Sequence, residues 1–175
     1  MNISCGIPQG SVLGPLLFLI YVNDFYKCSQ LFDFHLFADD TNLFINNKNL
    51  SELEALINQE LHQVGVWLST NKLSLNIDKT SFVIFHPPQK KIPFILQLKI
   101  FNQTIRNDSF VRYLGIMFDC NLNWKKHIHE LTKKLSKSIG ILTRIRFFVS
   151  KDVMLQLYYS LFYSLITYGI LVWGN

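Results

Sequence analysis

Apolar residues recur at three- and four-residue spacing along two parts of the chain, which is the pattern of helices with one buried face. The first part, residues 51–69, predicts a long amphipathic helix that begins with Ser51 and Glu54 in the spacing of a capping box. The second part begins after Asp119 and continues into a last apolar helix predicted over residues 151–172. The apolar stripe of the first helix consists of Leu53, Leu56, Ile57, Leu61, Val64, Trp67 and Leu68.

Shorter apolar runs bounded by turn-forming residues predict strands. Ala38, Asp39 and Asp40 stand between the first two runs, so these strands are expected to form a hairpin with a tight acidic turn. Asn107 and Asp108 are expected to close a second hairpin between the last two runs. The predicted strands cover residues 34–37, 41–45, 81–85, 95–105 and 110–118, and an apolar helix is predicted over residues 16–26.

These elements predict an α+β fold that changes near Cys120 from mixed helices and strands (residues 1–120) to helices alone (residues 121–175). The 175 residues are 49% apolar and 17% charged, which excludes a disordered chain. Three cysteines without a C-x-x-C pair argue against a disulfide framework or a zinc knuckle and favour an intracellular protein. The net charge of +5 fits a polyanionic partner such as nucleic acid.

Two apolar stretches resemble membrane or targeting segments by length or composition. Residues 12–22 are too short to span a bilayer, whereas residues 153–173 are long enough. Polar side chains interrupt the longer stretch, so a buried or partner-facing helix is preferred and no stable membrane insertion is expected. The interrupting residues are Gln156, Ser160, Ser164 and Thr167.

Asp39 and Asp40 are the first candidates for chemistry. Adjacent aspartates often cap backbone amides in turns, but apolar segments flank this pair, so the carboxylates are expected on the rim of a buried sheet. A hard cation is their natural partner. Asp39 is assigned as the main ligand because it continues the strand face of Asp33, His35 and Phe37, with Asp40 as the secondary ligand. Two divalent ions at this turn would support nucleotidyl transfer, which normally needs carboxylates from more than one strand.

Four segments resemble motifs of one enzyme family, the reverse transcriptases of non-LTR (LINE-type) retrotransposons, and they follow the family's order and approximate spacing. The similarity covers nearly the whole chain, and a jockey-like subgroup is indicated. The four are residues 6–15 (Gly-Ile-Pro-Gln-Gly-Ser-Val-Leu-Gly-Pro, B motif), residues 37–40 (Phe-Ala-Asp-Asp, catalytic C motif), residues 73–76 with Lys79 and Thr80 (D motif), and residues 113–115 with Asp119 (E region, or primer grip).

The resemblance implies an RNA-directed DNA polymerase that uses an RNA template, a DNA primer, a deoxynucleotide and two Mg²⁺ ions held by Asp39 and Asp40. It also implies that residues 1–120 are a partial palm and residues 121–175 an incomplete helical thumb. Lys79 would protonate or neutralise the departing pyrophosphate. The implied binding residues are Pro8, Gln9, Gly10, Ser11 and Phe37 for nucleotide and template, Tyr113, Leu114 and Gly115 for the primer, and Lys126, Lys133, Lys137 and Arg144 for the nucleic-acid backbone.

Purely structural interpretations stay open for these residues. The B-motif segment could be a helix-entry loop, Phe37 a core side chain, and Lys79 a solvated lysine. The four basic residues assigned to the nucleic-acid backbone could be a solvated helix face. The family's third carboxylate belongs to an A-motif strand before the B motif, and Asp24, Asp33 and Asp119 are poor replacements for it. The isolated chain is therefore expected not to polymerise DNA and to need the fingers and palm region of the same polyprotein. The alternatives are a non-catalytic nucleic-acid-binding remnant and a membrane-associated helical protein.

Overall fold

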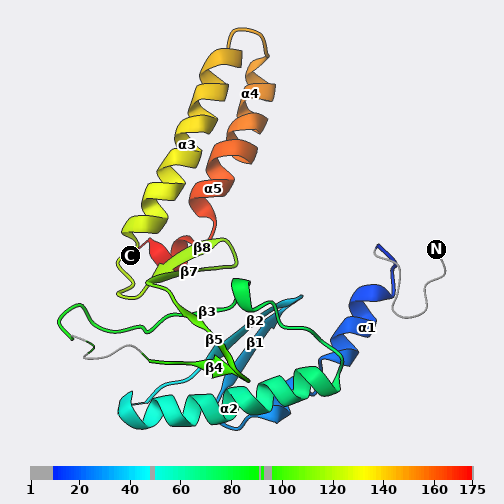
Figure 1. Cartoon of the computed structure of the whole chain (residues 1–175). Helices are drawn as coiled ribbons and strands as arrows, with labels where there is room; N and C mark the ends of the chain where they lie inside the picture. The colour runs from blue at the N-terminus through cyan, green and yellow to red at the C-terminus, as the bar shows by residue number, and fades with distance from the viewer. Residues whose placement is uncertain (1–9, 48–49, 91, 93–95, 175) are drawn as a thin grey trace. The chain divides into compact units, whose positions relative to one another are not determined.

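The computed structural model describes residues 10–47, 50–90, 92 and 96–174 (Figure 1). The chain divides into two compact units: unit 1 contains Met1–Thr80 and Phe94–Arg106, and unit 2 contains Ser81–Pro93 and Asn107–Asn175. Helices and short antiparallel strand pairs occur in both units, which confirms the predicted mixture of helices and strands. The assignment of residues 1–120 to a palm and 121–175 to a thumb stays a prediction.

In the described part of unit 1, the first element is α1 (Gly14–Tyr21), an apolar helix with no buried residue. It ends five residues before the predicted position, and the chain continues into the 3-10 helix η1 (Phe25–Cys28). The Tyr21 hydroxyl donates a hydrogen bond to the backbone carbonyl of Asn71. The apolar sequence therefore covers two short helices rather than one, and only η1 contributes to the core, through Phe25.

The strands β1 (Asp33–Phe37) and β2 (Asp40–Phe44) form the predicted antiparallel hairpin. The predicted burial of this hairpin is wrong, because most of its residues are exposed and Phe37 is 59% accessible. Two strands alone cannot cover both faces of a sheet, and the described structure pairs this hairpin with no third strand.

The long helix α2 (Leu50–Thr70) confirms the predicted amphipathic helix and forms the core of unit 1. Its stripe packs against η1 and against β4 (Lys99–Ile100), which pairs with β5 (Gln103–Thr104). The Asn58 side chain fixes this contact by donating to the Gln97 carbonyl and accepting from the Lys99 N–H. The Ser51 side chain of the predicted capping box lies outside the described residues. The buried apolar residues of α2 are Leu53, Ile57, Leu61 and Val64.

The strands of unit 2 differ from the prediction. β3 (Ser81–Phe82) pairs with β6 (Arg106–Asn107), and β7 (Phe110–Tyr113) pairs with β8 (Ile116–Asp119). The predicted hairpin turn at Asn107 and Asp108 is wrong, because the Asp108 N–H donates to the Phe82 carbonyl instead. Tight turns close the β4–β5 hairpin of unit 1 at residues 101–102 and the β7–β8 hairpin of unit 2 at residues 114–115.

The helical part of unit 2 is an antiparallel pair, with α3 (Lys125–Ile145) beside α4 (Lys151–Tyr158) and its continuations (Figure 1). The predicted single helix over residues 151–172 is wrong. Beyond α4 the chain forms a π-helical turn, η3, and a short helix, α5; it then leaves the helical conformation at Tyr168. None of the helices in the described ranges has the length and apolar character needed to cross a membrane. The continuations of α4 are η3 (Tyr159–Tyr163), α5 (Ser164–Thr167) and α6 (Ile170–Trp173).

Candidate functional site

The acidic turn of unit 1 is a two-residue turn of Ala38 and Asp39, because Phe37 pairs directly with Asp40. Ala38 has a φ of 51°, a left-handed conformation that costs about 1 kcal/mol or more for a residue with a Cβ. Both carboxylates are exposed, and neither has a hydrogen bond or an ion pair to another described residue. The turn therefore presents two adjacent free carboxylates to solvent.

The strand-face argument that ranks Asp39 above Asp40 as a metal ligand is wrong. Strand β1 ends at Phe37, so its alternation of faces does not continue to Asp39. Residues paired across two antiparallel strands lie on the same face, so Asp40 shares the face of Phe37. Asp39 lies at the end of the turn, and the assignment of both residues as ligands stays a prediction.

The two carboxylates fit part of a divalent-ion site. Mg²⁺ takes one or two carboxylate oxygens and fills its other positions with water and phosphate, so an exposed pair of aspartates suits one ion. Within the described ranges, no group of three His, Cys, Asp or Glu side chains lies together. A site with two ions therefore needs ligands in addition to Asp39 and Asp40.

The predicted nucleotide- and template-binding segment is described only from Gly10 onward, and Pro8 and Gln9 lie outside the described residues. Gly10 has a φ of 89°, and a Cβ there would meet no atom within 4 Å. The Ser11 Oγ accepts the Gly14 N–H at 3.0 Å, which holds the turn that leads into α1. Ser11 therefore has a local structural role, and Gly10 has open space beside its backbone.

The D-motif segment forms a small hydrogen-bonded turn that presents Lys79. The Asn76 side chain accepts the Lys79 N–H at 3.2 Å, and the Thr80 hydroxyl donates to the Asn76 carbonyl at 2.9 Å. These bonds close the 3-10 turn η2 (Ile77–Lys79), and the Lys79 side chain is exposed. The asparagine and threonine of the motif thus shape the backbone, and the lysine amine is free to reach a ligand.

The predicted primer-binding residues form the tight turn of the β7–β8 hairpin in unit 2. Leu114 and Gly115 have φ values of 46° and 82°, the sign pattern of a type I′ turn. The Tyr168 hydroxyl donates to the Leu114 carbonyl at 2.6 Å and so ties this turn to the end of the helical pair. Sequence analysis missed the role of Tyr168; the glycine that follows it, inside an apolar run, is the signal that marks the end of the helix.

Asp119 anchors the loop between β8 and α3. Its carboxylate accepts the backbone N–H groups of Asn121, Asn123 and Trp124 at 3.0–3.2 Å. These bonds hold a loop in which Leu122 and Trp124 both have positive φ. Asp119 is therefore occupied in the structure of unit 2, which agrees with its rejection as a third metal ligand.

We expect the Asp119→Ala variant to lower the free energy of unfolding of unit 2 by about 2 kcal/mol, because three backbone donors lose a charged acceptor. Asp119→Asn keeps one acceptor oxygen and should lose about half as much. Thermal unfolding of the purified chain, followed by near-ultraviolet circular dichroism, measures both changes. Equal stability of the alanine variant and the unsubstituted chain would contradict the anchoring role.

Comparison with known proteins identifies the family. A family model described as reverse transcriptase (RNA-dependent DNA polymerase) matches residues 1–118. The chain belongs to the reverse transcriptase family. The predicted relation to polymerases of non-LTR retrotransposons is thereby confirmed.

Three curated relatives show the kind of reverse transcriptase. The probable RNA-directed DNA polymerase from transposon X-element of Drosophila melanogaster is 25% identical over 99% of the chain. The RNA-directed DNA polymerase from mobile element jockey of the same species is 23% identical over 98%. The Pol polyprotein from retrotransposable element R1 of Bradysia coprophila is 26% identical over 98%. The chain spans about a fifth of the length of these relatives, and no solved structure matches it.

The basic residues predicted to contact the nucleic-acid backbone in this reverse transcriptase lie along one line of α3. Their spacings of seven, four and seven residues keep them within about 20° of a common line over roughly 27 Å. The Lys126 amine lies 2.6 Å from the centroid of the Phe110 ring and is thus held in a cation–π contact. The exposed residues Lys133, Lys137 and Arg144, called the basic stripe below, are the ones available to phosphates.

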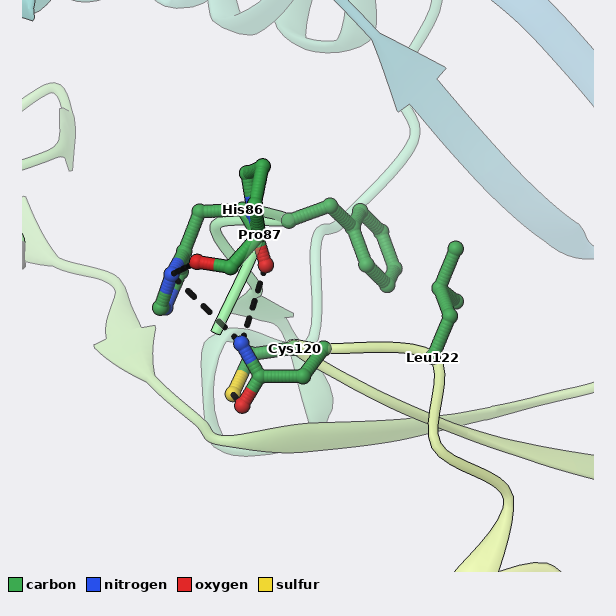
Figure 2. A pocket seen from close by; sticks show the side chains of 6 residues that line it. His86, Pro87, Cys120 and Leu122 are labelled. Atoms are coloured by element: carbon green, nitrogen blue, oxygen red, sulfur yellow. Dashed lines mark hydrogen bonds between the residues drawn. The ribbon is translucent and has the colours of Figure 1, made fainter. Parts of the chain in front are cut away.

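A shallow cavity of about 330 Å³ in unit 2 contains a histidine, a cysteine and an asparagine, but its polar atoms bond mainly to one another (Figure 2). The Asn121 amide donates to the His86 carbonyl at 2.9 Å, and the Cys120 carbonyl accepts the His86 N–H at 3.0 Å. The His86 ring nitrogen Nδ1 contacts the Pro87 carbonyl at 3.0 Å. These groups therefore join two loops and do not form a nucleophile–base pair.

His127 is the buried titratable group of unit 2. Its Nδ1 accepts the Met117 N–H at 3.3 Å, and its Nε2 is buried without a partner among the described residues. Burial lowers the pKa of His127 from its ordinary value of 6.5; Glu130 opposes the shift, whereas Lys134 and Arg112 add to it. A protonated Nδ1 would face the Met117 N–H donor, so the fold requires the neutral ring.

We expect the free energy of unfolding of unit 2 to fall as the pH drops below 6.5. The unfolded state binds a proton at the ordinary pKa, whereas the folded state resists protonation of His127, so stability is full above that pH and decreases below it. The slope is at most about 1.4 kcal/mol per pH unit. Thermal unfolding between pH 5 and 8 measures it. His127→Gln should flatten the profile, and His129→Gln, an exposed control, should leave it unchanged.

Proposed function

We propose that the chain forms part of the polymerase centre of an RNA-directed DNA polymerase from a non-LTR retrotransposon. The observation that carries this proposal is the β1–β2 turn, which holds Asp39 and Asp40 side by side at the exposed end of a hairpin. Ala38 beside them has a strained backbone, and such strain is concentrated at functional sites. Unit 1 would then belong to the palm, and the helical pair of unit 2 to the thumb.

In this proposal Asp39 and Asp40 hold Mg²⁺. Bound divalent ions stabilise the charge on the attacking 3′-oxygen of the primer and on the leaving pyrophosphate. The exposed ring of Phe37 lies next to the turn and offers an apolar surface to the sugar of the deoxynucleotide. The open backbone at Gly10 permits close approach of a base, because no Cβ intervenes.

Lys79, Leu114 and Tyr168 complete the proposed roles. The Lys79 amine, exposed on the η2 turn, donates a proton to the leaving pyrophosphate. The β7–β8 turn at Leu114 contacts the primer strand, and the Tyr168 hydroxyl keeps that turn in place. The RNA template, the DNA primer and the deoxynucleotide are the proposed substrates.

We further propose that the isolated 175-residue chain does not incorporate nucleotides. Two ions need carboxylates from more than one strand, and Asp39 and Asp40 come from one turn. The fingers and the rest of the palm of the same polyprotein would supply the additional ligand. A primer-extension assay with the purified chain, Mg²⁺ and a primed RNA template tests this proposal: no extension is expected. If the chain extends the primer and the Asp39→Asn variant does not, the proposal that the chain lacks a required ligand is refuted. The same result would support Asp39 as a residue of the polymerase centre.

A second candidate function is nucleic-acid binding without catalysis, which the exposed basic stripe favours. Its three cations would track phosphates whether or not a nucleotide is incorporated. Salt-dependent binding of a primed template together with an acidic turn that binds no divalent ion would support this candidate over the polymerase.

A further inference from the structure

The turn between α3 and α4 carries two phenylalanine rings that are largely exposed in the described structure. Phe147 is 77% exposed and Phe148 is 85% exposed, which makes them the most exposed phenylalanines among the described residues. The backbone under them is fixed, because the Phe148 N–H donates to the Ile145 carbonyl at 2.8 Å. Ser150 then caps α4 by accepting the Val153 N–H. The rings are therefore presented by a defined turn.

Cations flank these rings on both sides. Arg144 and Arg146 precede them and Lys151 follows, whereas Asp152 is the single acid nearby. The Arg146 guanidinium lies 4.4 Å from the centroid of the Phe147 ring, a stacked cation–π contact. We call residues 144–151 the aromatic tip. The tip combines two flat aromatic rings with three positive charges in the short segment that joins the two helices.

We propose that the aromatic tip binds single-stranded nucleic acid, with unpaired bases stacked on Phe147 and Phe148 and phosphates held by the adjacent cations. Aromatic rings beside a positively charged path are the features that bind single strands without regard to sequence. Arg144 belongs to both the tip and the basic stripe, so phosphate contacts along α3 can continue into base stacking at its end. This inference rests on the proposed function, because it assigns the tip to a strand that the polymerase handles.

The composition of the tip favours nucleic acid over a protein partner or a lipid surface. Phenylalanine and arginine also occur in protein interfaces, but the three cations of the tip stand against one nearby acid, and this excess of positive charge favours a polyanion. Two adjacent rings are also a small apolar surface for membrane binding, which grows with the apolar area buried. In a nucleic acid, the anionic phosphates match the cations of the tip and the planar bases match its two rings.

The test measures binding of a fluorescently labelled 20-nucleotide single-stranded RNA to the full chain by anisotropy. The Phe147→Ala/Phe148→Ala variant should weaken binding about tenfold or more, since stacking on each ring is lost. Phe148→Trp should retain binding, because it keeps a stacking surface. Leu171→Ala is the matched control: this side chain is 91% exposed in the same unit but is aliphatic and lies outside the tip, so binding should not change.

Salt dependence separates stacking from charge. The double alanine variant should keep the slope of log affinity against log salt, whereas Arg144→Gln/Arg146→Gln should reduce it by about 1.4. Unchanged RNA affinity in the double alanine variant would overturn the proposal. An equal loss of RNA affinity in the Leu171→Ala control would also overturn it. A third contrary result would be binding to phosphatidylserine vesicles that requires the two rings, together with RNA binding that does not. The assay contains no deoxynucleotide and does not measure metal binding at the acidic turn, so it can fail while divalent-ion binding at Asp39 is retained.

Discussion

Replacing Asp39 with asparagine should abolish most divalent-ion binding at the β1–β2 turn. The substitution removes one of two negative charges and replaces a carboxylate by a neutral amide, whose single oxygen is a weaker ligand for a hard cation, so affinity should fall about tenfold or more. Mn²⁺ is a suitable probe because it is paramagnetic and prefers the same oxygen ligands as Mg²⁺. Line broadening of the amide signals of residues 37–41 in NMR spectra, titrated with Mn²⁺, measures the change.

The control for this variant is Asp33→Asn, which removes an exposed carboxylate from the opposite end of the same hairpin. Asp33 lies four residues before Phe37, about 13 Å along the strand, so its loss should not affect the turn. In a polymerase that carries these residues together with its other catalytic carboxylates, Asp39→Asn should lower the incorporation rate about a hundredfold or more. Equal Mn²⁺ broadening in both variants would show that the acidic turn is not a metal site.

Replacing Leu61 with alanine should destabilise unit 1 by about 2–5 kcal/mol. Leu61 is 5% exposed on the packed face of α2, and its truncation removes buried apolar atoms and leaves a cavity. The α2 amides belong to unit 1, so their exchange reports on the stability of this unit. Hydrogen–deuterium exchange of the α2 amides measures the loss within unit 1 directly.

Leu56→Ala provides the matched control, because Leu56 is on the same helix and is 37% exposed. Its truncation should cost less than about 1 kcal/mol, since little buried surface is lost. If both variants increased the exchange of α2 equally, Leu61 would not belong to the core, and the packing of α2 on β4 would be wrong.

The acidic turn between β1 and β2 was predictable from the sequence only in part. The hairpin and its acidic turn were predicted correctly, because two apolar runs on either side of adjacent aspartates are a local signal. The strand-face argument for ranking Asp39 above Asp40 was wrong, because Ala38 adopts a positive φ and interrupts the alternation, and the ranking itself stays a prediction. A sequence does not show in advance which non-glycine residue will accept that conformation.

Local side-chain bonds were within reach of sequence analysis, whereas long-range bonds were not. Ser11, Asn76 and Asp119 each bond to backbone groups two to five residues away, so their spacing alone could have indicated these roles. The bond from Tyr168 to the Leu114 carbonyl spans 54 residues. It depends on how the helical pair returns to the β7–β8 hairpin, and no local pattern contains that information.

The two long amphipathic helices, α2 and α3, and the family of the protein follow from the sequence alone. Helical periodicity is a local property, and the motif residues identify the family through their chemical types and order. The positions of the later hairpin turns, the exposure of the β1–β2 hairpin and the break of the last helix at Tyr168 follow from the three-dimensional fold. These features depend on which distant segments pack together, because burial and strand pairing are set by contacts between residues far apart in the chain.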